Sequence, residues 1–79
     1  MATDAAKSLA ALVRVTRSLR NHVARGCTMA NYRSLALIDR WNDARENLRN
    51  GSPEGAALFA QWCEAERIAP DATAYDFFA

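Results

Sequence analysis

The amino-acid sequence predicts an all-α fold: a compact three-helix bundle, formed by a long antiparallel helix hairpin plus a third helix, with a short C-terminal helix or turn. Three observations predict this class. Apolar residues recur at helical spacing in three successive segments, residues typical of helix ends separate these segments, and no segment shows the sustained apolar–polar alternation of a β-strand. Because the chain has 79 residues, we expect a single helical domain over residues 1–79.

The first helix is predicted over residues 4–25. Thr3 is a suitable N-cap, Asp4 lies in the first turn, where a carboxylate favours the positive end of the helix dipole, and Gly26 can take a left-handed conformation after the end. At about 100° per residue, one face collects an apolar stripe. This stripe comprises Leu9, Leu12, Val13, Thr16, Leu19 and Val23.

The second helix is predicted over residues 29–49, between Thr28 as N-cap and an Asn-Gly pair that can end it in a left-handed turn. Its main stripe comprises Ala30, Leu37, Trp41, Ala44 and Leu48. Tyr32 and Leu35 lie on another side, so we expect this helix to be central and contacted on two faces.

The third helix is predicted over residues 53–69. Ser52 is a suitable N-cap, Pro53 occupies the first helical position, where a missing N–H costs nothing, and Pro70 disfavours helix in the residue before it. The inward face is expected to comprise Leu58, Phe59, Trp62, Ala65 and Ala69.

The last predicted element is a short helix over residues 72–78, in which Thr73 and Asp76 are spaced as in a capping box. It carries three aromatic residues, Tyr75, Phe77 and Phe78. Exposed aromatic side chains would form an adhesive patch, so we expect this tail to fold back and close the core. Its docking onto a partner or a second copy of the chain is the alternative.

One face of the first predicted helix carries a basic ridge, defined here as Lys7, Arg14, Arg17, Asn21 and Arg25. These residues cluster within about 80° of one another, opposite the apolar stripe. A guanidinium group matches a carboxylate or a phosphate bidentately, so the ridge indicates contact with an acidic protein surface or with phosphates. A solvated helix face is the alternative that involves no partner.

Three further groups of residues are candidates for interfaces or metal binding. Arg20 lies within the apolar stripe, where its stem could follow the core edge or its charge could meet an acidic residue of a second chain in a homodimer. Three carboxylates share one side of the second predicted helix: Asp39, Asp43 and Glu46. Without opposing ligands they favour a solvated or salt-bridged face. His22, Cys27 and Cys63 lack the spacing of zinc ligands.

These observations favour a protein without metal or cofactor and without enzymatic activity, because one histidine in so small a helical frame does not supply a catalytic triad. We expect His22 at the surface, Cys63 packed as a small apolar group, and Cys27 in a loop. No apolar run reaches the roughly 20 residues of a membrane span, and two cysteines without a leader pattern favour a reduced, cytoplasmic setting.

The expected function is that of a small non-enzymatic protein-binding regulator or inhibitor. Short all-helical chains without motifs are common among products of phages and mobile elements that act on a host complex, including antagonists of the anti-CRISPR type. One alternative is a nucleic-acid-associated regulator that binds phosphates non-specifically through the basic ridge. Another is a structural or assembly subunit that dimerises through the tail and Arg20.

Overall fold

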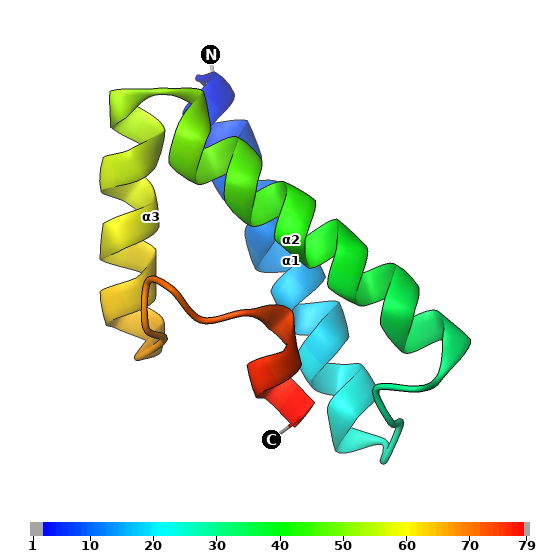
Figure 1. The fold of residues 1–79 in the computed structure, drawn as a ribbon. Helices are drawn as coiled ribbons and strands as arrows, with labels where there is room; N and C mark the ends of the chain where they lie inside the picture. Colours follow the sequence, from blue (N-terminus) through cyan, green and yellow to red (C-terminus); the bar gives the residue numbers. More distant parts are fainter. Residues whose placement is uncertain (1–2, 79) are drawn as a thin grey trace.

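The computed structural model describes residues 3–78, which form three α-helices, one 3-10 helix and no strand (Figure 1). The helices are α1 (Asp4–Ala24), α2 (Tyr32–Gly51), α3 (Pro53–Glu66) and the 3-10 helix η1 (Ala74–Phe78). The long helices α1 and α2 form an antiparallel pair, and α3 and η1 lie on the same side of that pair. The predicted three-helix bundle with a short C-terminal turn is confirmed.

The helices α1 and α3 begin at the N-cap residues that the sequence predicts. The amide of Ala6 donates to Thr3 Oγ1 at 3.0 Å, and the amide of Gly55 donates to Ser52 Oγ at 3.0 Å. Each cap satisfies one of the amides that have no partner in the first helical turn. After α1 the backbone turns at Gly26, whose φ is 82°, a value that favours glycine.

The predicted bounds of α2 are wrong at both ends. Its N-cap is Asn31, whose side-chain oxygen accepts from the amide of Arg33 at 2.8 Å; Thr28 lies in the preceding turn, and Ala30 is exposed outside the helix. At the other end the helix continues through Gly51, which has no positive φ. The chain then changes direction at one extended residue, Ser52, with φ −167° and ψ 161°, and not through the predicted left-handed turn.

The predicted end of α3 is also wrong, because the helix stops at Glu66 rather than at residue 69. Arg67 adopts a left-handed conformation, φ 58° and ψ 41°, and the amide of Ile68 donates to the Cys63 carbonyl at 2.9 Å. Ile68 then packs against the core, the apolar contact typical of this helix ending. Ala69, predicted to face inward, therefore lies outside the helix and is exposed, and Ala65, within α3, is exposed as well.

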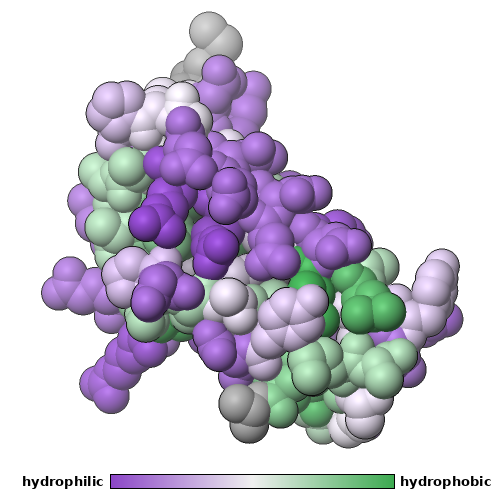
Figure 2. All heavy atoms as spheres, in the orientation of Figure 1, coloured by the Kyte–Doolittle hydropathy of each residue, from purple (hydrophilic) through white to green (hydrophobic). Residues whose placement is uncertain are grey.

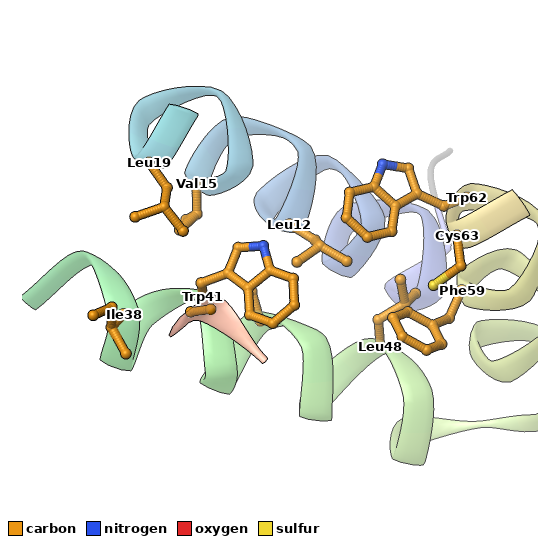
Figure 3. Close-up of a cluster of buried hydrophobic side chains, with 11 residues drawn as sticks. Leu12, Val15, Leu19, Ile38, Trp41, Leu48, Phe59, Trp62 and Cys63 are labelled. Atoms are coloured by element: carbon orange, nitrogen blue, oxygen red, sulfur yellow. The ribbon is translucent and has the colours of Figure 1, made fainter. Parts of the chain in front are cut away.

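The core lies between α1 and α2 and extends to α3 (Figure 3). Its apolar side chains that are at most 2% exposed are Leu12, Leu19, Ile38, Trp41, Leu48, Cys63 and Ala74. Trp41 lies between the two long helices, where its indole N–H donates to Thr16 Oγ1 at 2.8 Å. The Thr16 hydroxyl in turn donates to the Leu12 carbonyl at 2.7 Å, so this buried polar chain is satisfied.

The C-terminal tail folds back onto the core, as predicted. The Phe77 ring meets Trp41 edge-on, with ring centroids 5.6 Å apart and planes at 73°, and Ala74 is fully buried. The Thr73 amide donates to Asp76 Oδ2 at 2.8 Å, which is one half of the predicted capping box. Phe78 packs partly buried against the core, whereas Tyr75 stays half-exposed.

Two arginines of the helical bundle contact the C-terminal tail. The Arg45 guanidinium donates to the carbonyl of Ala72 and lies 5.4 Å from the centre of the Trp41 ring. Arg20 pairs with Glu66 at 3.0 Å and lies 5.7 Å from the centre of the Phe77 ring. The carboxylate that meets Arg20 thus comes from its own chain.

Gly55 of α3 lies close to the backbone of α2, which gives a test of the packing. A Cβ at residue 55 would lie 2.2 Å from the Leu48 carbonyl oxygen, whereas a Cβ at Gly51 would meet nothing within 4 Å. We expect Gly55→Ala to lower the free energy of unfolding by about 1–3 kcal/mol despite the better helix propensity of alanine. The control Gly51→Ala is expected to raise it by about 0.4–1 kcal/mol. Urea denaturation measures both, and equal effects would contradict this packing.

The hydrogen bond between Thr16 and Trp41 gives a second test. Thr16→Val keeps the shape but leaves the buried indole N–H without an acceptor, so we expect a loss of about 1–3 kcal/mol in the free energy of unfolding. In a Trp41→Phe background the same substitution should cost much less, because there is no N–H left to satisfy. A double-mutant cycle in urea measures this difference, and equal costs in both backgrounds would mean that the bond contributes nothing.

Candidate functional site

All five residues of the basic ridge are exposed on the outer side of α1. The ridge does not border one groove but lies between two. Arg17 and Asn21 border a groove between α1 and α3, whereas Arg14 borders the seam between α1 and α2. Lys7 and Arg25 border neither. The ridge predicted from one helix is therefore divided between two surfaces of the folded chain.

The groove between α1 and α3 is small, about 210 Å³, and has an apolar floor that includes Val13 and the edge of Trp62. Arg20 and Glu66 lie across it as an ion pair at 3.0 Å, with side chains 45% and 38% exposed. Exposed pairs of this kind contribute on the order of 0–1 kcal/mol. The pair neutralises Arg20 and leaves Arg17 as the unpaired cation at this groove.

A second surface lies on the side of the α1–α2 pair that α3 and η1 leave uncovered. At 100° per residue Ser18 lies roughly opposite Arg20 around α1, so the two residues border different faces of the pair. The uncovered side has two shallow depressions, about 450 and 460 Å³, that share Arg40. We define the open face by the residues that line them: Ala11, Arg14, Val15, Ser18, His22, Tyr32, Arg33, Ala36, Leu37, Arg40, Asp43, Ala44 and Asn47.

The open face is basic, because it carries three arginines and one carboxylate. Within residues 3–78 the ion pairs are Arg20 with Glu66 and Arg45 with Glu46. The three arginines of the open face belong to neither pair: Arg14, Arg33 and Arg40. Three guanidinium groups are therefore available to an external anion.

Sequence reasoning missed Arg33 and Arg40, although a signal was present. The two residues are seven positions apart, so they share one side of a helix. The sequence prediction took the basic surface from the first helix alone. In the structure, antiparallel packing brings these two arginines of α2 to the same face as Arg14.

His22 is not the simple surface residue that the sequence predicts. It is half-buried, and its Nε2 lies 2.7 Å from the hydroxyl of Ser34, which is fully buried. A base and a nucleophile lie this close in hydrolytic enzymes, but a buried hydroxyl does not reach a substrate carbonyl. The hydrogen bond instead joins the C-terminal end of α1 to the start of α2 and satisfies the buried serine.

The predicted acidic stripe of α2 is exposed, as expected for a solvated or salt-bridged face. Glu46 pairs with Arg45 at 3.9 Å and accepts from the Asn50 side chain at 3.2 Å, and Asp39 points to solvent. Among residues 3–78 no three His, Cys, Asp or Glu side chains come close enough to hold a metal ion. In the same part of the chain, no helix is long and apolar enough to cross a membrane.

Both cysteines are free thiols in different surroundings. Burial raises the pKa of the Cys63 thiol, an effect that the positive charges of Arg49 and Arg45 only partly oppose. Cys27 is partly exposed and borders a hollow beside Phe78. The buried thiol is therefore kept in its protonated, weakly nucleophilic form.

Comparison of the chain with models of known protein families, with curated proteins and with solved structures finds no match. The inferences about function therefore depend on the geometry of the open face and the ridge.

The difference between the two thiols predicts selective alkylation. In single-cysteine variants at pH 8, Cys63 in Cys27→Ser should react with iodoacetamide at least about tenfold more slowly than Cys27 in Cys63→Ser, because burial of Cys63 suppresses thiolate formation and also blocks access of the reagent. Mass spectrometry over time measures the rates. Addition of urea should remove the difference, and equal rates without urea would contradict the burial of Cys63.

Proposed function

We propose that this chain is a non-enzymatic protein-binding regulator that engages an acidic protein surface through the basic side of α1. The observation that carries the proposal is the set of exposed arginines of the ridge that are in no ion pair within residues 3–78: Arg14, Arg17 and Arg25. Guanidinium groups at such positions are typical of interface hot spots, where a carboxylate of the partner supplies the missing bonds.

The neighbours of these arginines favour carboxylates over a phosphate backbone. Asp43 lies beside Arg14 on the open face, and Glu66 lies beside Arg17 in the groove between α1 and α3. A continuous phosphate chain would meet repulsion from Asp43, whereas the charge of Glu66 is balanced by Arg20. Discrete carboxylates on a folded partner can be placed to avoid Asp43.

We propose further that the partner belongs to a host complex and that binding inhibits it. This is the mode of action of small helical antagonists from phages and mobile elements, with anti-CRISPR-type inhibition as one case. A compact bundle with a charged surface supports such a role, because occupying a partner's binding surface needs no chemistry. Two free thiols are consistent with action in the reducing cytoplasm.

Capture of the partner tests the proposal. The double variant Arg14→Glu/Arg17→Glu should lose more than about tenfold of the partner captured from a lysate of the native host, because two carboxylates replace the groups that meet the acidic surface. The control Ala57→Glu/Ala65→Glu adds the same two carboxylates at exposed positions of α3. Circular dichroism should show both variants folded, and undiminished capture by the ridge variant would refute the proposal.

A nucleic-acid-associated regulator is the second candidate, and one observation favours it. Tyr32 is 83% exposed and borders the same depression as Arg33 and Arg40, which together resemble a stacking platform beside a basic groove. If the chain binds duplex DNA through Z phosphates, log affinity should fall with log salt with a slope of about −0.9Z. Filter binding across a salt series measures the slope, and a lack of DNA or RNA retention at low salt would exclude this candidate.

A further inference from the structure

The α1–α2 pair has two faces, and the chain covers only one of them. On the covered face α3 packs as a helix of 14 residues, and its Glu66 pairs with Arg20 of α1. The covered face thus shows how this hairpin holds a helix: apolar side chains fill the space between the helices, and a carboxylate meets an arginine at the edge. The open face offers the same two components.

Small and apolar side chains form part of the open face. Val15 and Ala44, each 8% exposed, line one depression, and Ala36 and Leu37 line the other. Small side chains at these positions let the backbone of a second helix come close, as at tightly packed helix contacts.

The edges of the open face carry its charge on both helices. Arg14 comes from α1, and Arg33 and Arg40 come from α2, with Asp43 as the only carboxylate of this face. From Tyr32 to Asn47 the face follows α2 for about 22 Å at 1.5 Å per residue. This length suits about fifteen residues of helix.

We propose that the open face docks an acidic amphipathic helix of a protein partner. The apolar side of that helix lies on the small and apolar side chains, and its flanking carboxylates meet Arg14, Arg33 and Arg40. This inference rests on the proposed function, since it names the segment of the partner and the face that receives it. It places this segment of the partner on the α1–α2 seam, where Arg14 belongs to both the ridge and the open face, whereas Arg17 and Lys7 do not line the seam.

A defined peptide tests this inference. The probe is a synthetic helix of about 18 residues with a leucine and alanine stripe flanked by glutamates, a length chosen from the extent of the face. The control peptide has lysine at every glutamate position. Amide spectra of the ¹⁵N-labelled chain should show shifts at Ala11, Ser18, Ala36, Leu37 and Asn47 with the acidic peptide, none with the lysine peptide, and little change along α3.

Two variants of equal charge change locate the contact. Arg33→Glu/Arg40→Glu should weaken binding of the acidic peptide by about tenfold or more, because both reversed charges lie on the open face. Lys7→Glu/Arg17→Glu carries the same change of charge on the ridge and should weaken binding less than the open-face variant. The control Arg49→Glu/Arg67→Glu changes two exposed residues outside both surfaces and should weaken binding about threefold at most. Thermal unfolding should show that all three variants remain folded.

Four results would overturn the inference. If the acidic peptide binds but only Lys7→Glu/Arg17→Glu weakens it, the ridge is the contact and the proposed function stands without the open face. If a 20-nucleotide single strand shifts the open face and the peptide does not, both the inference and the proposed function fail. Shifts of the same amides with protein concentration alone would assign the face to a second copy of this chain. Absence of any peptide binding would refute the docking of an acidic helix.

Discussion

Burial of Trp41 between α1 and α2 is the constraint on which the rest of the structure depends. Its indole N–H must have an acceptor in the core, and Thr16 of α1 supplies one at 2.8 Å. The same ring receives the edge of Phe77 and the guanidinium of Arg45, so the tail and its connecting loop are positioned by it. In a chain of 79 residues the core is small, and one large side chain that contacts several elements has a correspondingly large share of the stability.

The contacts of the C-terminal tail and α3 determine which arginine side chains are in ion pairs and which are not. The two arginines that fasten the tail, Arg20 and Arg45, are the ones that have carboxylate partners within residues 3–78. On the covered side of the hairpin Arg20 pairs with Glu66, whereas the three arginines of the open face are in no ion pair within residues 3–78. Figure 2 shows the mixture of polar and apolar surface on one side of the molecule. This difference supports the proposed docking of an acidic partner on the uncovered side, because the covered side already holds α3 and the tail.

Local signals in the sequence predicted most of the fold, and the failures have identifiable causes. Ser52 and the proline after it combine two independent helix-start preferences, so the start of α3 was predictable to the residue. Thr28 and Asn31 are both good N-caps, and only tertiary packing selects between them. Arginine is rarely left-handed, so nothing local predicted the stop at Arg67; the packing of Ile68 determines it. The candidate surface was half predictable, since periodicity placed Arg14 outward but pairing of two helices was needed to bring Arg40 beside it.

The most direct test of this account is the NOE spectrum of the Trp41 indole N–H, whose position fixes the register of α1 against α2 and hence which arginines share the open face. The structure predicts cross-peaks from this proton to Thr16 and from the carbon-bound ring protons of Trp41 to those of Phe77, together with slow exchange of the indole N–H with solvent. A rapidly exchanging indole proton without these cross-peaks would show that the helices pack differently. Arg14, Arg33 and Arg40 would then have no reason to lie on one face.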